Sequence, residues 1–144
     1  EALARAAADG AGDQCIMLTA AQTNAEHFLA AGAYLFVCPE NLASMSGAMK
    51  EMFDRNYYPI LGKIEGRAYA TAIAAGSDGT GAQSQIDRIA TGWRLKRVAE
   101  HLIVNCDAQT EAEILAPKTV TEKDLRVCRD LGAAMAEGLR LGVF

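Results

Sequence analysis

The sequence predicts an α/β domain in which helices cover a mainly parallel sheet. Short apolar segments rich in β-forming residues alternate along the chain with longer segments whose apolar residues recur at helical spacing. Capping residues and glycines stand at the boundaries between these segments. Such alternation is typical of parallel strands joined by right-handed helical crossovers.

Length and composition fit one globular domain, residues 1–144. Hydrophobic residues make up 51% of the chain and charged residues 22%, which is ordinary for a folded protein. The net charge of −4 and the lack of a basic patch argue against nucleic acid as a partner. No apolar run approaches the roughly 18 residues that a membrane-spanning helix needs, so no membrane partner is expected.

The four cysteines lie far apart and form no CxxC pair. This spacing favours reduced thiols in a cytoplasmic protein over a disulfide framework or a zinc site, and no metal ligands are predicted. Cys38 and Cys106 end predicted strands, and we favour a structural role for them over a redox role. His27 and His101 have no Asp or Glu constellation around them and are interpreted as structural or surface residues.

The amino-terminal part departs from the alternation. Residues 1–10 look like the latter part of a helix closed by Gly10, with neither an N-cap nor a strand ahead of it. Because a strand–helix–strand unit needs a strand before this helix, we expect that the first strand is missing from this sequence. The alternative is a fold that begins with a free helix.

Two strands and a helix are predicted next. Residues 14–20 (QCIMLTA) are short and apolar, which indicates a strand. A helix is predicted over 23–32, where Thr23 and Glu26 have capping-box spacing. Residues 33–38 (AYLFVC) form a continuous apolar run, as found in parallel strands that are buried on both faces.

The rest of the chain continues the alternation. Two further strands are predicted over 66–76 and 101–106, and a last helix begins at Thr121 with Asp124 at capping distance. The helices between and after the strands each carry an apolar face. These faces are formed by Met45, Met49, Met52 and Phe53, by Ile86, Ile89, Ala90 and Trp93, and by Leu125, Cys128, Gly132, Met135 and Leu139.

Two loops at the carboxyl ends of predicted strands are small and polar. The first, CPENLASMSG (38–47), leaves room for a ligand to approach the backbone, and N–H groups at the start of the next helix can donate to ring acceptors. The alternative is an ordinary surface crossover with a serine helix cap. The second, AAGSDGTGAQSQ (74–85), is glycine-rich but is neither a dinucleotide fingerprint nor a P-loop. Ligands of parallel sheets bind at this edge.

Taken together, PENLASMSGAMKEMFDR (39–55) and AAGSDGTGAQ (74–83) resemble the flavodoxin-like NAD(P)H-dependent FMN reductase and quinone reductase family. The resemblance implies a doubly wound, three-layer α/β/α domain with strand order 2-1-3-4-5 and FMN at the switch point. The strands predicted above would be the second to fifth, and the missing one would be central. The family's phosphate loop follows that first strand and is therefore absent from this sequence.

The resemblance also implies which residues contact FMN. The first loop would border the isoalloxazine ring, and the second would embrace its other side. Matching residues of the first loop are Pro39, Glu40, Asn41, Leu42, Ala43, Ser44, Met45, Ser46 and Gly47. Those of the second are Ala75, Gly76, Ser77, Asp78, Gly79 and Gly81. Replacing Gly79 with a β-branched residue is expected to weaken FMN binding.

We therefore expect an FMN-binding oxidoreductase that passes electrons from NAD(P)H to a small-molecule acceptor such as a quinone or a flavin. No catalytic side chain is predicted, because the cofactor performs the redox chemistry. The alternatives are an electron-shuttle flavodoxin and a binding module without cofactor. A homodimer or tetramer is plausible from the resemblance.

Two departures from the family are visible. Leu42 and Met45 stand where electron-carrier flavodoxins usually have aromatic residues, and Ala90-Thr91-Gly92 stands where the quinone reductases have a histidine.

Four basic residues offer charge for a nicotinamide dinucleotide phosphate, although a solvated face is the more ordinary interpretation. These are Arg88, Arg94, Lys96 and Arg97.

Overall fold

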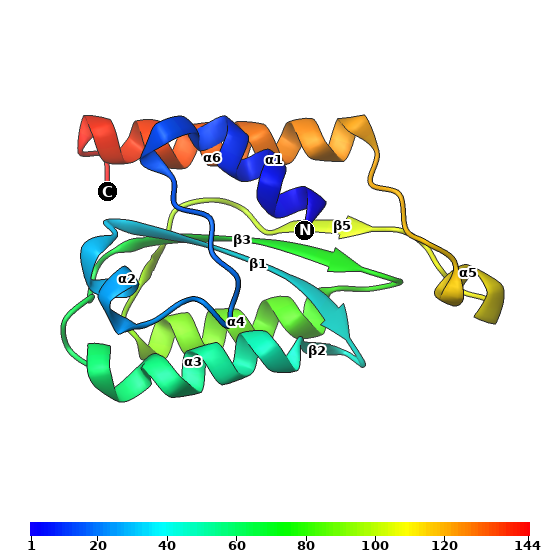
Figure 1. Cartoon of the computed structure of the whole chain (residues 1–144), viewed down its shortest axis with the longest axis horizontal. Helices are drawn as coiled ribbons and strands as arrows, with labels where there is room; N and C mark the ends of the chain where they lie inside the picture. The colour runs from blue at the N-terminus through cyan, green and yellow to red at the C-terminus, as the bar shows by residue number, and fades with distance from the viewer.

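A parallel sheet of three strands forms the centre of the protein in the computed structural model, which describes residues 1–144 (Figure 1). Its strands are β1 (Ala33–Asn41), β3 (Ala68–Ala75) and β5 (Leu102–Asn105). Two short strands, β2 (Ser44–Met45) and β4 (Lys96–Arg97), pair with β1 and β3. The strands predicted over 33–38, 66–76 and 101–106 are thereby confirmed.

The register brings the carboxyl ends of these strands to one edge. β1 and β3 pair in parallel from Ala33↔Ala68 to Pro39↔Ala74, and β5 pairs with β3 up to Ala75↔Asn105. β1, β3 and β5 lie in the order expected for the third, fourth and fifth strands. The loops that leave this edge are therefore neighbours.

Helices cover both faces of the sheet, so the predicted three-layer arrangement is confirmed (Figure 1). One layer holds α1 (Ala2–Ala11) and α6 (Glu122–Leu141), and the other holds α3 (Gly47–Ile60) and α4 (Thr80–Gly92). Shorter helices are η1 (Gly12–Gln14), α2 (Ala25–Ala30) and α5 (Glu111–Leu115). No helix combines the length and the apolar character needed to cross a membrane.

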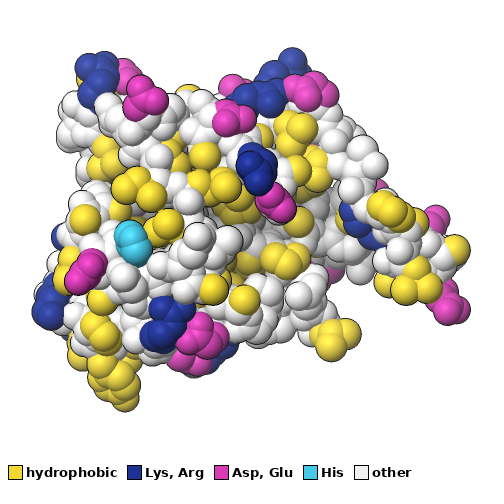
Figure 2. All heavy atoms as spheres, viewed as in Figure 1, with side chains coloured by type: hydrophobic (Ala, Val, Ile, Leu, Met, Phe, Trp, Pro, Cys, Tyr) yellow, Lys and Arg dark blue, Asp and Glu magenta, His cyan; other side chains and the backbone are white.

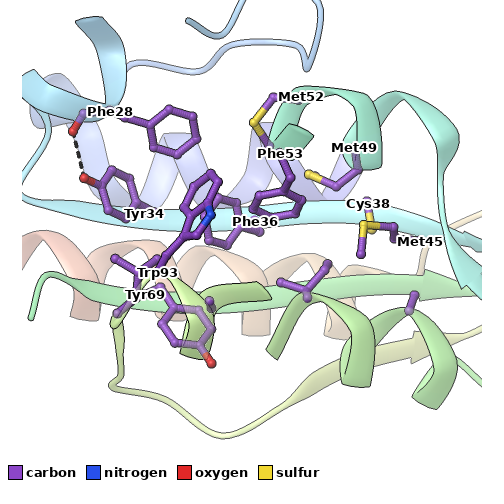
Figure 3. Packing of buried hydrophobic residues seen from close by; sticks show 14 of the residues in the cluster. Phe28, Tyr34, Phe36, Cys38, Met45, Met49, Met52, Phe53, Tyr69 and Trp93 are labelled. Carbon is purple, nitrogen blue, oxygen red and sulfur yellow. Dashed lines mark hydrogen bonds between the residues drawn. The ribbon is translucent and has the colours of Figure 1, made fainter. Parts of the chain in front are cut away.

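The larger hydrophobic core lies between the sheet and the layer of α3 and α4 (Figure 3). Aromatic rings from four elements meet there, with Trp93 edge-on to both Phe28 and Phe53. The hydroxyl of Tyr34 donates to the carbonyl oxygen of Phe28 at 2.7 Å, so this polar group is satisfied among the aromatic rings. Most residues of the two predicted apolar faces are buried in this core, and Ile89 is half-buried. Met45 is buried as well, but it lies in β2 and not on the helix to which the sequence assigned it.

Two glycines allow α1 and α6 to pack closely against each other in the other helical layer. A Cβ on Gly10 would lie 1.9 Å from the carbonyl oxygen of Arg129, and one on Gly132 would lie 1.9 Å from that of Ala7. Each glycine thus lets the backbone of one helix touch the other. The sequence predicted that Gly10 closes this helix, and that prediction was wrong. The helix continues to Ala11 and is capped by Gly12, where φ is 66°.

The strand predicted over 14–20 is absent, and that prediction was wrong. These residues pair with no strand, and Ile16 is 79% exposed. β-propensity alone does not make a strand, because an extended segment needs a hydrogen-bonded neighbour. The capping box of α2 is also displaced by one residue, since Asn24 and His27 form it instead of Thr23 and Glu26.

Candidate functional site

The first predicted loop is a tight hairpin that projects from the carboxyl edge of the sheet. β1 and β2 pair at Glu40↔Met45 and Asn41↔Ser44, which leaves Leu42 and Ala43 as the two turn residues. Both have positive φ, 51° and 59°, a conformation that non-glycine residues rarely adopt. Leu42 is fully exposed at the tip. An apolar side chain is thus presented to solvent at the edge where ligands of parallel sheets bind.

Glu40 ties this hairpin to the second predicted loop. Its carboxylate accepts hydrogen bonds from the backbone N–H groups of Gly79, at 2.8 Å, and Ala82, at 2.9 Å. It therefore caps the amino end of α4, where a negative charge is also favoured by the helix dipole. Its oxygens are already engaged within the protein. The sequence predicted Glu40 beside a flavin ring, and that placement stays a prediction.

A second contact reinforces the hairpin from α4. The side-chain oxygen of Gln85 accepts hydrogen bonds from the N–H of Met45 at 3.0 Å and from the hydroxyl of Ser44 at 2.8 Å. Sequence reasoning did not find Gln85. Its only signal is a polar residue in the second turn of a helix that begins at this edge.

Two glycines of the second loop are required by packing. A Cβ on Gly81 would lie 2.2 Å from the carbonyl oxygen of Ala43, and one on Gly79 would lie 2.4 Å from Cγ2 of Ile103. Gly79 also has a φ of 92°. The predicted loss of FMN binding on substituting Gly79 would therefore not distinguish ligand contact from damage to the loop.

Other glycines at the same edge leave open space. A Cβ on Gly47 or on Gly76 would meet no atom within 4 Å. Gly76 directly follows β3, and Gly47 is the first residue of α3, which Ser46 caps by accepting from the N–H of Met49. These two positions are where a ligand could come close to the backbone.

Free backbone donors adjoin Gly76. The N–H groups of Ser77 and Asp78 donate to no atom of the protein, and both residues are exposed. Exposed N–H groups at a helix start can donate to the oxygen and nitrogen acceptors of a ligand.

The third loop at this edge follows β5. The side chain of Asn105 donates to the carbonyl oxygen of Ser77 at 2.6 Å and accepts from the N–H of Asp107 at 2.8 Å. It thereby holds the loops after β3 and β5 together. Asn105 was not predicted as a site residue, although a polar residue at the end of an apolar parallel strand is a usable signal.

The structure brings the predicted site residues to one edge but in different environments. Met45, Ala75 and Gly79 are buried, and Met45 belongs to the hydrophobic core. Glu40, Ser44, Ser46, Gly76 and Gly81 are half-buried. The exposed ones are Pro39, Asn41, Leu42, Ala43, Gly47, Ser77 and Asp78.

The thiols nearest the edge differ in exposure. Cys38 is buried, and burial raises the pKa of its thiol, with a weaker opposing contribution from the backbone of Ser46. Cys106 is exposed, and its sulfur lies 2.9 Å from the carbonyl oxygen of Ala75. A buried thiol with a raised pKa is a poor nucleophile, which agrees with a structural role for Cys38.

The basic residues considered for a dinucleotide phosphate lie elsewhere. Lys96 and Arg97 pair with Ala68 and Tyr69 at the amino end of β3, about 25 Å along the strand from Gly76. Arg97 is bound to Asp87, and Arg94 to Glu65. No group of three or more His, Cys, Asp or Glu side chains is arranged to hold a metal ion.

This architecture is the flavodoxin-like fold. A flavodoxin from the domain Archaea superposes with a TM-score of 0.76 over 96% of this chain and 89% of its own, at 18% sequence identity. A WrbA-like flavodoxin from Agrobacterium tumefaciens has a TM-score of 0.71 over 97% of this chain and 88% of its own, at 16% identity. At these identities the likeness establishes the fold alone.

Larger proteins contain the same fold as one part. The rubredoxin oxygen oxidoreductase of Desulfovibrio gigas matches 98% of this chain but only 33% of its own length, with a TM-score of 0.67 and 15% identity. No protein-family model and no curated protein sequence matches this chain.

The residues at the edge fit a flat heteroaromatic ring better than they fit a phosphate. The free donors of Ser77 and Asp78 and the open space over Gly76 suit the polar border of a ring. The charged side chains of the three loops are acidic: Glu40, Asp78 and Asp107. A phosphate among them would meet like charges without a basic partner.

Proposed function

We propose that this protein binds FMN through its ring at the carboxyl edge of β1 and β3 and passes electrons from NAD(P)H to a small acceptor. The observation that carries the proposal is the pair of free N–H donors of Ser77 and Asp78 beside the open space at Gly76, in a chain with a flavodoxin-like fold. When bound, FMN supplies the redox chemistry, so no acid–base side chain is needed.

In this proposal the chain's own residues position the ring. The N–H groups of Ser77 and Asp78 donate to ring acceptors, and Asn105 keeps that loop in place through its bond to the carbonyl oxygen of Ser77. The hairpin tip around Leu42 borders the ring and leaves part of it open to a small acceptor. Glu40 and Gln85 fix the hairpin against α4 and act on the ligand only indirectly.

Flavin binding is tested with two ligands that share the ring. The protein is equilibrated with FMN and, separately, with riboflavin, and affinity is measured from the perturbed visible spectrum and the quenched flavin fluorescence. The edge of the sheet offers N–H groups that can donate to the flavin ring but no basic group for the phosphate of FMN. Both ligands are therefore expected to bind with affinities within about tenfold of each other. An unperturbed spectrum with both flavins would overturn the proposal.

A matched pair of glycine variants locates the ring. Gly76→Val fills the open space over the end of β3, whereas Gly92→Val fills open space at the far end of α4. Flavin affinity is expected to fall at least tenfold in Gly76→Val and to stay unchanged in Gly92→Val. Equal affinities in the two variants would place the ring elsewhere.

The reductase role is tested by adding NADPH or NADH to the flavin-loaded protein without oxygen. Bleaching of the flavin absorption by the isolated protein is the expected result. Bleaching only after addition of a separate reductase would show that the protein is an electron shuttle and not a reductase.

A further inference from the structure

The segment after β5 forms an arm that stands away from the body of the protein. This arm, residues 109–118, contains helix α5 and projects beyond the carboxyl edge of the sheet (Figure 1), and every one of its residues is exposed. No hydrogen bond or ion pair joins the arm to the rest of the chain. The arm can therefore change its position without breaking such a contact.

The arm is held together by its own hydrogen bonds. At its start, the carboxylate of Glu113 accepts from the N–H groups of Gln109, at 2.9 Å, and Thr110, at 2.8 Å. At its end, the ammonium group of Lys118 donates to three carbonyl oxygens at the carboxyl end of α5. These bonds make the arm a small rigid unit with one joint at each end.

The arm begins at the candidate site. The residue before it, Ala108, is buried, and its N–H donates to the carbonyl oxygen of Gly76 at 2.8 Å. Gly76 borders the open space in which we place the flavin ring. At a helical rise of about 1.5 Å per residue, the stretch from Ala108 to Leu115 spans about 10 Å. Leu115 can therefore reach across a ligand that touches Gly76.

The arm presents two adjacent apolar side chains to solvent. Ile114 is 59% exposed and Leu115 is 76% exposed, and Figure 2 shows hydrophobic side chains on this projecting part of the molecule. Leu42 is fully exposed at the tip of the hairpin, which leaves the same edge of the sheet. Exposed apolar side chains that gather around one site, instead of being scattered singly, indicate a binding surface.

We propose that the arm closes over the flavin ring and that Ile114 and Leu115 cover the ring face that Leu42 leaves open. This inference rests on the proposed function, because the covered surface is the ring at Gly76. Closure buries apolar surface of the arm and of the ring, which favours the closed position. It costs no hydrogen bond of the protein, because the arm turns at its two joints.

The charges of the arm fit a neutral ring and not an anion. Besides Ile114 and Leu115, its large side chains include two carboxylates, Glu111 and Glu113, and one ammonium group, Lys118. The ammonium group is already bound to carbonyl oxygens within the arm. The arm therefore offers an apolar surface with a negative border, which would repel a phosphate or another anion.

The test compares two double variants. Ile114→Ser/Leu115→Ser removes the apolar cover, and Leu141→Ser/Val143→Ser removes two similarly exposed apolar side chains at the carboxyl-terminal end of the chain. Affinity is measured from flavin fluorescence for riboflavin and for lumiflavin, which has the ring without the ribityl chain. Both affinities are expected to fall at least about tenfold in the arm variant and to stay unchanged in the control.

A conservative variant separates the cover from damage to the arm. Ile114→Leu/Leu115→Ile keeps the apolar surface, so its flavin affinities are expected to stay within about twofold of the wild type. Circular dichroism and urea unfolding establish that all variants are folded. Because both positions are exposed, the free energy of unfolding is expected to change by less than a measurable amount in each of them.

Closure itself is followed at the second joint, without measuring activity. Trypsin cleaves after Lys118, and saturating riboflavin is expected to slow this cleavage at least about tenfold in the wild type. In Ile114→Ser/Leu115→Ser, also saturated with riboflavin, the slowing should be lost. Cleavage after the exposed Lys63, in the loop before β3 at the other end of the sheet, is the internal control and should not change.

The outcomes separate the cover from the flavin site. Unchanged flavin affinity in the arm variant, or cleavage after Lys118 that riboflavin does not slow in the wild type, would overturn the cover and leave the flavin site standing. If the wild type binds neither flavin, the cover and the proposed function are both wrong. If Lys118 becomes protected without flavin as the protein concentration is raised, a second copy covers the arm and the proposal is wrong.

Discussion

Glu40 at the end of β1 caps α4 by accepting a hydrogen bond from Gly79, a residue 39 positions later in the chain, at 2.8 Å. A second bond from Ala82 engages the other carboxylate oxygen at 2.9 Å. One side chain thus fixes the distance between the two loops of the candidate site. The geometry of any ligand held between them depends on this contact.

Removing the Glu40 carboxylate is expected to destabilise the fold. Glu40→Ala leaves two helix-end N–H groups without their acceptor and should lower the free energy of unfolding by about 1–3 kcal/mol. Glu40→Gln keeps an acceptor oxygen but loses the charge, so a smaller loss is expected. Urea unfolding measures both. The control is Glu100→Ala, which removes an exposed carboxylate without a partner and should change stability by less than about 0.5 kcal/mol.

Gly81 should tolerate no side chain. In Gly81→Ala the new Cβ meets the carbonyl oxygen of Ala43, and a loss of about 1–3 kcal/mol in unfolding free energy is expected from overpacking. Gly47→Ala places a Cβ in open space in the first turn of α3 and should stabilise the protein by up to about 1 kcal/mol. Equal thermal midpoints for the two variants would contradict the close approach of the hairpin to α4.

The hairpin turn is strained, and relieving the strain should stabilise the protein. Ala43 has a φ of 59° although it carries a Cβ. Glycine adopts this conformation without steric cost, so Ala43→Gly is expected to raise the free energy of unfolding by about 1 kcal/mol. Ala48→Gly, in the first turn of helix α3, is the control and should lower it by a similar amount. A loss of stability in Ala43→Gly would show that the turn conformation is wrong.

The packing of α1 on α6 gives a further prediction. Gly132→Ala would press a Cβ against the carbonyl oxygen of Ala7, so the two helices must separate and the free energy of unfolding should fall by about 1–3 kcal/mol. Gly92→Ala is the matched control, because a Cβ there meets no atom. Chemical unfolding monitored by circular dichroism compares the two. No difference between them would mean that the helices are not in backbone contact.

The three parallel strands were predictable because each is a continuous apolar run, a pattern typical of parallel strands that are buried on both faces. Their order in the sheet was implied only by the family resemblance. The segment 14–20 has the same composition but lies beside an open groove, so its sequence predicted a strand that the available neighbours do not form. The local sequence pattern indicates a preference for the extended conformation. Whether the segment pairs as a β-strand depends on a neighbouring strand elsewhere in the chain.

The position of the two loops was predictable from the sequence, but the structural roles of their residues were not. Small residues after β1 and β3 correctly indicated two loops at one edge. The same composition could not show that Gly79 and Gly81 serve packing while Gly47 and Gly76 leave open space. That distinction depends on Ile103 and Ala43, which lie far from these glycines in sequence, and no local signal encodes such contacts.

Asp87 is the centre of a polar cluster between α4 and the amino end of β3. It accepts from the Tyr69 hydroxyl at 3.1 Å and from the Gln83 side chain at 3.0 Å, and it pairs with Arg97 and with His101. Burial by itself would raise the pKa of the Asp87 carboxyl, but the bonds from Arg97, Gln83 and Tyr69 outweigh burial and hold that pKa below its usual value.

This depressed pKa fixes the sign of a pH dependence. The stability that ionised Asp87 contributes is fully present above its unfolded pKa of about 3.9 and is lost as the pH falls through its lower pKa in the folded protein. Asp87→Asn should therefore be less stable than the wild type near neutral pH, and the difference should shrink as the pH falls below about 4. Asp130→Asn, at an exposed position without a hydrogen bond, is the control. The free energy of unfolding of all three proteins is measured by urea unfolding between about pH 7 and pH 2.5. If the difference in this free energy between wild type and Asp87→Asn stays constant with pH, the carboxylate does not stabilise the cluster.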